Sequence, residues 1–424
     1  MPRSSTASHW QRTVQVVSLT QIAILVGFNF AFPFIPLLIQ DLGVTDPSQL
    51  ELFSGLAIGM GGIVMALASP LWGMLADRFG AKTMFVRAVG AGSIALALQA
   101  AVANVWQLIA ARMLQGALAG TNTAGAMLVA AIAPKERTGW AIGLMNAAIQ
   151  VGNLIGPVLG GIVILVIGVR GSFLVGALLL AACTVAIVAL VEDAPITASP
   201  PVRAGVGGGL RDLMAPFAWP GLRGVMIVGS LIQIAYSGTV PLIAIYVQDL
   251  HRPEWLSEEV AIGLAFAVSA LAAAVAMPIL GGIADRHDSR RLLVVSLVVI
   301  AVGLVPQALV PDALVFLFFR LFIGVGLAGM TSAIAVLTRA GAPDGAEGRA
   351  FGALAAAQNL GWGFGPIIGS AVAAVIGIPG LYLAGAVGTL IVVVPAALSK
   401  SWFVPAEGAA EPSLLRVSEP AELP

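Results

Sequence analysis

The side chains best able to do chemistry in this sequence are a few charged ones inside long apolar stretches. Arg112 stands about six residues into one such stretch, roughly 9 Å deep if the stretch is a helix across a membrane. Gln115 and Asn122 continue its face at helical spacing. Because a charge at this depth is costly and usually functional, we expect a polar stripe facing the interior of a helix bundle. The alternative is an anchor that reaches the nearer membrane surface.

A second charged pattern occurs twice. GMLADRFGAK at 73–82 returns as GGIADRHDSR at 281–290, a step of 208 residues. Two glycines permit a tight turn, and an aspartate there can face a helix N-terminus or pair with a basic neighbour. Such a turn could act as a latch; the alternative is an ordinary basic turn. The copy has Asp288 where the second glycine would stand. The candidate latch residues are Gly73, Asp77, Arg78, Gly80, Lys82, Asp285 and Arg286.

The composition says what surrounds these charges. Of 424 residues, 59% are hydrophobic and only 10% are charged, which is too apolar for one soluble core. The formal net charge is zero, so a basic nucleic-acid surface is excluded. Cys183 is the single cysteine and cannot form an intramolecular disulfide, and the three histidines do not form a metal-ligand cluster. We therefore expect the lipid bilayer as solvent, with no metal, cofactor or nucleic acid.

The apolar runs divide the chain into two sets of six. A spanning helix needs about 20 apolar residues, and twelve such runs predict an all-α membrane protein built from two pseudo-symmetric six-helix bundles. The expected parts are an N-terminal tail at 1–12, bundles at 13–191 and 222–400, a linker at 192–221 and a disordered tail at 401–424. The runs lie near 13–39, 50–72, 84–103, 106–132, 139–165, 172–191, 222–247, 259–280, 292–309, 314–338, 349–375 and 381–400.

The basic residues set the orientation. Apart from Arg112 and Arg320, which lie within spans, only Arg170 and Arg252 fall on one predicted side of the membrane, whereas all other lysines and arginines, Arg87 among them, fall on the other. Because basic residues collect on the cytoplasmic side, both termini are expected in the cytoplasm of a multi-pass protein of the cell membrane.

An internal repeat relates the two bundles. Gln40-Asp41-Leu42 matches Gln248-Asp249-Leu250, and Arg112 matches Arg320, at the same 208-residue step. GNLIGPVLGG at 152–161 returns as GWGFGPIIGS at 361–370, with the step increased to 209. Each half is therefore a copy of one six-helix unit in the same orientation, an organisation that fits transporters whose halves rock about a midplane site.

These motifs also carry a family resemblance, over about residues 13 to 400. The chain resembles the major facilitator superfamily and, within it, the drug:proton antiporter branch. GMLADRFGAK is similar to the family's helix 2–3 loop motif, LIAARMLQGALAG at 108–120 to its helix 4 arginine motif, and GNLIGPVLGG to the helix 5 glycine–proline motif of antiporters. FIPLLIQDLGV at 34–44 is similar to bacterial multidrug exporters. The resemblance implies alternating access, with the latch tethering the halves while the site faces outward.

The fifth run carries glycines at every fourth position. Gly152, Gly156 and Gly160 would form a flat ridge that lets another helix approach closely, and Pro157 removes one backbone hydrogen bond. The ridge could be a hinge or a seal against the other half, or it could serve static packing.

A candidate substrate cavity follows from the predicted helix faces. Amides and aromatic rings among apolar walls suit a lipophilic, weakly polar molecule, although each polar group could instead join two helices. The candidates are Asn29, Phe32, Asn122, Asn146, Gln150, Gln233, Tyr236, Ser237, Gln358 and Trp362.

No carboxylate falls in the middle of a predicted span. Proton coupling would therefore use a carboxylate at a helix end, such as Asp41 answering Arg112. We expect a monomeric transporter, not an enzyme, that exports small amphipathic molecules as a proton antiporter. The alternatives are a carrier for one metabolite, an anion attracted to Arg112 among them, and a membrane sensor that has lost transport.

Overall fold

The computed structural model describes residues 5–134, 137–191, 219–343 and 346–398. This part of the chain is helical throughout its regular structure and contains no strand. Its first half contains α1 (Ser5–Ala31), η1 (Phe32–Phe34), α2 (Ile35–Asp41), α3 (Pro47–Phe79), α4 (Ala81–Ala100), α5 (Val105–Leu118), α6 (Thr121–Ile132) and α7 (Thr138–Leu190). Its second half contains α9 (Pro220–Thr239), η2 (Val240–Leu242), α10 (Ile243–Asp249), α11 (Glu258–Arg286), α12 (Ser289–Gln307), α13 (Ala313–Gly341) and α14 (Glu347–Leu398).

The helices give the twelve expected crossings, although the breaks between them differ from the prediction. Nine helices of the described chain are long and apolar enough to span a membrane. Two of these, α7 and α14, each hold two crossings that meet without a loop at Gly168 and Gly377, whose φ values are +72° and +75°. The remaining crossing is formed by α5 and α6, separated at Gly120. The all-α fold with twelve crossings is confirmed. The fifth and sixth crossings are distinct, as predicted, but they meet at the Gly168 kink without a loop. The prediction of an unbroken fourth helix was wrong.

Five helices of the described chain, α3, α5, α11, α12 and α13, start at a side-chain cap. The caps satisfy backbone N–H groups that have no partner inside the helix. Asp46 accepts from the Gln49 N–H at the start of α3, and Asn104 from the Gln107 N–H at the start of α5. Hydrogen bonds from Ser48 and Gln49 hold the pKa of Asp46 below its usual value, so this cap persists at neutral pH and is lost as the pH falls through that lowered pKa.

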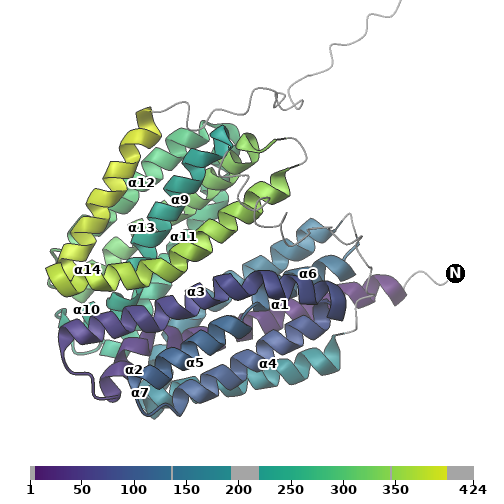
Figure 1. The fold of residues 1–424 in the computed structure, drawn as a ribbon, viewed down its shortest axis with the longest axis horizontal. Coiled ribbons are helices and arrows are strands. Elements are labelled where there is room, and N and C mark those ends of the chain that lie inside the picture. The colour runs from purple at the N-terminus through teal and green to yellow at the C-terminus, as the bar shows by residue number, and fades with distance from the viewer. Residues whose placement is uncertain (1–4, 135–136, 192–218, 344–345, 399–424) are drawn as a thin grey trace, which may run out of the picture.

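Both halves bend their first helix at the same place. A one-turn 3₁₀ segment follows α1 at Phe32–Phe34 and follows α9 at Val240–Leu242, and each contains a proline, Pro33 or Pro241. A proline has no backbone N–H to continue the helical ladder. The matched breaks aim the short helices α2 and α10 at each other, and Figure 1 shows both where the two bundles approach.

The two bundles meet near one end only of the view in Figure 1, and their ribbons diverge toward the end that carries α6. Across the halves, α3 packs on α14 and α7 packs on α11. We call the end that holds Gln40 and Gln248 the junction end, and the end that holds Gly80 and Arg286 the basic end. The predicted linker at 192–221 and tail at 401–424 lie outside the described residues, apart from 219–221.

The bend at Gly377 gives a direct test of the fold. A side chain is strained at φ +75° and ψ 165°, so Gly377→Ala should destabilise the protein by about 1–3 kcal/mol and lower its thermal midpoint. Gly352→Ala is the matched control in the same helix, because a methyl group there would meet nothing within 4 Å. Thermal unfolding of the purified protein in detergent measures both. Equal midpoints for the two variants would contradict the bend as the joint between the last two crossings.

Candidate functional site

Arg112 is held by neutral groups from three elements. Its Nε donates to the Ala57 carbonyl on α3 at 3.3 Å, and its Nη1 donates to Oε1 of Gln115, one turn further along α5. Its guanidinium carbon lies 5.5 Å from the centre of the Phe32 ring in η1, a distance at which a cation is attracted to a ring. The structure thus brings together three predicted site residues, Arg112, Gln115 and Phe32.

Asp41 does not pair with this arginine in the observed form. It is exposed at the last residue of α2, and within the described chain no ion pair joins it to Arg112. Gln115 supplies the accepting oxygen instead, so the arginine stands close to the junction end without a carboxylate. The predicted pairing of Asp41 with Arg112 therefore remains a hypothesis about another stage of the transport cycle.

The second half repeats the arginine but not its acceptor. Arg320 is 1% exposed, and its Nε donates to the Ala265 carbonyl at 2.8 Å, where Ala265 is the repeat equivalent of Ala57. The equivalent of Gln115 is Ile323, which offers no oxygen. Nη2 of Arg320 accordingly has no hydrogen-bond partner among the described residues. The repeat predicts the position of this arginine, whereas its burial comes from packing.

Several predicted cavity amides form contacts between helices of the first half. Gln21 on α1 donates to Asn122 on α6. Asn29 on α1 donates to Asn153 on α7 at 3.0 Å, and Asn153 donates to Gln150 at 3.3 Å. Asn146 lies one turn before Gln150 and is exposed, as are Gln150 and Asn122. These amides therefore line up along the facing surfaces of α1, α6 and α7.

In the second half, an aromatic pair replaces the amide chain. Tyr236 on α9 and Trp362 on α14 meet edge to face, with ring centres 6.2 Å apart. Gln233 and Gln358 are half-buried on the same two helices. Ser237 was wrongly predicted to line a cavity. It is fully buried, and its hydroxyl donates to the Gly361 carbonyl at 2.9 Å, because α9 and α14 pack too closely there to leave space.

The predicted latch lies at the basic end, and its turn is made by one glycine. Gly80 has a φ of +84° and separates α3 from α4, whereas Gly73 lies inside α3, so the prediction that Gly73 shapes the turn was wrong. Arg78, Asp285 and Arg286 are exposed. Lys82 is half-buried at the start of α4, and the side chain of Asp77 lies outside what the structure describes. The latch remains a prediction.

The glycine ridge of the fifth crossing packs within its own half. A methyl group at Gly156 would lie 2.6 Å from Cβ of Asn29, and one at Gly160 would lie 2.5 Å from the Phe30 carbonyl oxygen. Gly152 faces Leu25 in the same way. The ridge therefore seats α7 on α1, and in the observed form these three glycines do not seal α7 against the other half.

The seal between the halves uses neighbouring residues. A methyl group at Gly161 would lie 2.5 Å from the Glu259 carbonyl oxygen, and one at Gly263 would lie 2.4 Å from the Pro157 carbonyl oxygen. These contacts join α7 to α11, so Pro157, unlike the ridge glycines, does face the other half. We call this contact the α7–α11 seam.

A second seam joins α3 to α14 and was missed in the sequence. Methyl groups at Gly59 and Gly62 would lie 2.5 Å and 3.0 Å from the backbone of Gly363, and one at Gly55 would meet Ser370. The available signal was the spacing of Gly55 and Gly59, since small residues four apart favour close helix approach. Both seams lie in the parts of these helices nearer the junction end.

Arg87 and Trp72 form another contact that sequence reasoning missed. The Arg87 guanidinium carbon lies 3.5 Å from the centre of the Trp72 ring, and its nitrogens donate to the carbonyls of Leu118 and Ala119. Trp72 donates from its ring nitrogen to the Ala117 carbonyl at 2.6 Å. Together they satisfy the carbonyls exposed where α5 ends, so the break in the fourth crossing is stabilised. The sequence had marked Arg87 only as an orienting charge.

An apolar groove of about 320 Å³ runs beside the α7–α11 seam. Only leucine, isoleucine, valine and alanine line it, so it suits hydrocarbon rather than water. The lining residues are Leu154, Ile155, Val158, Leu159, Leu264, Ala267, Val268 and Leu271.

The bond between Arg112 and Gln115 can be tested apart from any activity. Hydrogen bonds to charged groups contribute about 1.5–3 kcal/mol. Gln115→Leu should therefore lower stability, because it leaves one guanidinium nitrogen of Arg112 without this acceptor. The double variant Arg112→Met/Gln115→Leu should be less destabilised than the sum of the single variants. A double-mutant cycle on unfolding midpoints measures this coupling. Additive effects would show that the two side chains do not act together.

Comparison with known proteins agrees with this architecture. The family model described as Major Facilitator Superfamily matches residues 17–257 and 225–421. Among curated relatives, the multidrug resistance protein MdtG of Serratia proteamaculans is 30% identical over 373 residues, covering 86% of this chain and 88% of that one. The multi-drug resistance efflux pump PmrA homolog of Lactococcus lactis is 30% identical over 399 residues, covering 93% and 95%.

Solved structures share the fold at low sequence identity. A bacterial homolog of the human lysosomal transporter Spinster, in an inward-facing and occupied conformation, superposes with a TM-score of 0.73 at 13% identity, covering 93% of this chain and 96% of that one. The human organic anion transporter MFSD10 superposes with a TM-score of 0.64 at 17% identity, covering 91% and 99%. With the family model matching both halves and relatives aligned over most of its length, this chain belongs to the Major Facilitator Superfamily and is a multi-pass membrane transporter.

Proposed function

We propose that this transporter exports small amphipathic molecules of several kinds by alternating access, as a multidrug efflux protein. The observation that carries the proposal is that both seams between the halves lie toward the junction end. The candidate amides and aromatic rings lie on the helices that form these seams or on helices packed against them. The names of the curated relatives support the same activity.

The direction of access depends on which end faces the cytoplasm. The basic end carries Arg78, Arg286, Arg290, Arg291 and Arg339, and cytoplasmic loops are rich in such residues. We assign this end and both termini to the cytoplasm of a cell-membrane protein that works as a monomer. The structure is then an inward-facing form, closed at its junction end and ready to accept substrate from the cytoplasm.

The surrounding chemistry favours neutral or weakly polar substrates. Amides such as Gln150 and the pair Tyr236 and Trp362 offer hydrogen bonds and aromatic surface. The apolar groove beside the α7–α11 seam adds a surface for hydrocarbon. A strongly cationic drug would meet the charge of Arg112 with no carboxylate beside it, so such drugs should be poor substrates.

Proton entry is proposed to drive export, with Arg112 tuning the coupling. Two carboxylates at the junction end are candidates for the proton. Asp41 is exposed, whereas Glu51 is buried in α3 at 8% exposure. Proton release on substrate binding should fall in Asp41→Asn or Glu51→Gln if either residue takes part. Unchanged release in one variant would remove that residue from the mechanism.

A second candidate function has one observation in its favour. Arg112 is bonded only to neutral groups, so an anionic metabolite could supply the missing counter-charge. A carrier of this kind would act on one compound rather than several. It would move a carboxylated compound and leave lipophilic dyes where they are.

Dye transport separates these functions. In inverted membrane vesicles, a lipophilic fluorescent dye should accumulate when a pH gradient is imposed, and should not accumulate without it. Arg112→Ala should lower the gradient-driven rate at least tenfold, and Asp77→Asn should lower it by preventing the latch from closing in the outward-facing form. Dye accumulation at the same rate with and without the pH gradient would exclude proton antiport. No movement by a correctly inserted protein would favour the metabolite carrier.

The α7–α11 seam gives a further test of alternation. Gly161→Leu places a side chain where a methyl group would already lie 2.5 Å from the Glu259 carbonyl oxygen, so the junction end should no longer close. Transport should be lost although the protein inserts and remains folded. Gly143→Leu is the matched control on the same helix, because a methyl group there would meet nothing within 4 Å. Full transport by Gly161→Leu would mean that closure at this seam is not required.

A further inference from the structure

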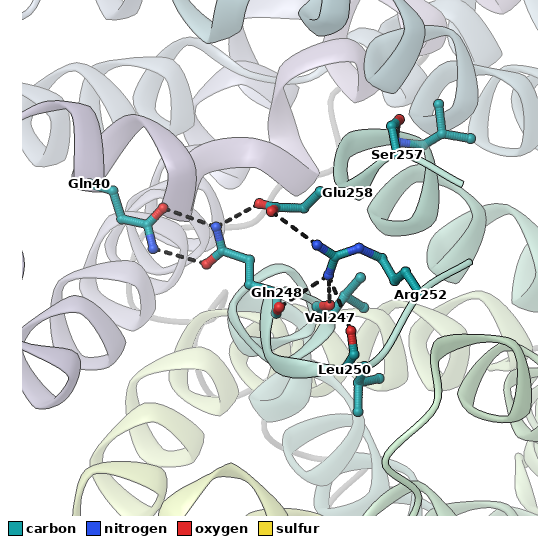
Figure 2. Close-up of polar contacts among 8 residues, drawn as sticks. Gln40, Val247, Gln248, Leu250, Arg252, Ser257 and Glu258 are labelled. Atoms are coloured by element: carbon teal, nitrogen blue, oxygen red, sulfur yellow. Dashed lines mark hydrogen bonds and ion pairs between the residues drawn. The ribbon is translucent and has the colours of Figure 1, made fainter. Parts of the chain in front are cut away.

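Two glutamines related by the repeat bind each other across the junction end. Gln40 on α2 donates to Oε1 of Gln248 at 2.9 Å, and Gln248 on α10 donates to Oε1 of Gln40 at 3.2 Å (Figure 2). One residue comes from each half, and both side chains are half-buried. This reciprocal pair is a polar link between the halves, beyond the backbone contacts of the two seams.

The neighbouring carboxylate of Glu258 fixes which way the Gln248 amide points. Gln248 Nε2 also donates to Glu258 Oε1 at 2.7 Å, as Figure 2 shows. An ionised carboxylate can only accept hydrogen bonds, so the amide nitrogen of Gln248 must turn toward it. The amide oxygen then faces Gln40, which is the orientation that the reciprocal pair requires.

Arg252 holds the carboxylate in place. Its Nη2 lies 3.4 Å from Glu258 Oε2, and its Nη1 donates to the carbonyls of Val247, Gln248 and Leu250, at 2.6, 3.1 and 3.4 Å. These carbonyls belong to the C-terminal end of α10, where a cation is favourable. Arg252 therefore ties Glu258 to the helix that carries Gln248, and all of these contacts lie within one half (Figure 2).

The repeat shows that this support is one-sided. The glutamines are equivalent, but the position equivalent to Glu258 is Leu50 and the position equivalent to Arg252 is Val44. No matching ion pair can therefore orient Gln40 from the first half. The link between the halves is symmetric, and its orientation is set by the second half alone.

We propose that Gln40, Gln248, Glu258 and Arg252 form a lock that holds the junction end closed, with Glu258 as the positioning residue for Gln248. The lock rests on the proposed alternating access, because it sets the balance between the observed form and the form open at the junction end. When the junction end opens, Gln40 separates from Gln248, whereas the bonds of Glu258 to Gln248 and Arg252 remain within the second half.

Removing the charge of Glu258 should release the lock without removing any volume. In Glu258→Gln, the new amide can either donate or accept, so Gln248 is free to turn over and the pair with Gln40 loses its fixed orientation. The population open at the junction end should rise about five- to tenfold, because charge-assisted hydrogen bonds are roughly twice as strong as neutral ones. Glu258→Asp, which keeps the charge, should restore part of the closed population.

Distance measurements between spin labels test the lock directly. Labels on cysteines at Thr45 and Glu254, both exposed, report the separation of the halves at the junction end in a Cys183→Ala background. Glu258→Gln and Gln248→Leu should both increase the long-distance population in nanodiscs. Glu259→Gln is the matched control, because it makes the same change of charge at the next residue, whose side chain is not among the four that form the lock. Its backbone carbonyl, which meets Gly161 in the α7–α11 seam, is unchanged by the substitution. Native-like distances in Glu258→Gln, or an equal shift in Glu259→Gln, would overturn the proposal.

The double variant separates positioning from an independent effect. If Glu258 acts by orienting Gln248, then Gln248→Leu/Glu258→Gln should open the junction end no further than Gln248→Leu alone. Additive shifts would show that Glu258 acts by another route. These distances require no substrate, so a protein that moves no dye can still show the lock. A protein that exports dye normally but shows no shift would refute the lock and leave the proposed function intact.

Discussion

Backbone contact between the halves is the interaction on which the rest of this structure depends. At both seams, glycines let one helix approach the carbonyl oxygens of another so closely that no Cβ would fit. In a bilayer, where apolar side chains gain little by leaving lipid, helix association relies on such close packing and on polar links. Contacts without interlocking side chains can also separate as units, which is what a seam between two moving halves requires.

The same kind of contact is used inside each half for the opposite purpose. Gly152, Gly156 and Gly160 seat α7 on α1, while Gly161, the next residue, meets the other half. Neighbouring residues of a helix lie about 100° apart, so one helix can present a permanent face and a separable face side by side. Opening at the α7–α11 seam would therefore leave the packing of α7 on α1 intact, and each bundle could move as a rigid body.

The sequence predicted what depends on period and composition. The twelve crossings, the duplication and the placement of Gln115 on the same helix face as Arg112 all follow from spacing along one chain. The hydrogen bond between these two side chains was not predicted, since Asp41 was the expected partner of Arg112. It could not decide which helix the Gly152–Gly160 ridge meets, because a small-residue face fits any close partner. It also missed the break at Gly120, where Arg87 and Trp72 supply hydrogen-bond donors to the carbonyls that the break exposes. Ser237 was assigned to a cavity for a similar reason. A serine that faces a cavity and a serine that bonds a neighbouring helix occupy the same kind of position in the sequence of a helix.

Divergence between the copies gives the two halves different tasks. Because both halves have the same orientation, a duplicated unit with identical halves would repeat each contact at the same end of both halves, and the two halves would share every task. Here the arginine of the first half has Gln115 as its acceptor, whereas Arg320 is buried beside Ile323. The junction glutamines remain a matched pair, but only the second half has the carboxylate that orients them. The first half thus keeps a charged side chain with a neutral partner, and in the proposed lock the second half stabilises the closed form. Coupling an ion to substrate would then depend on Arg112, and the balance between the two forms would depend on Glu258.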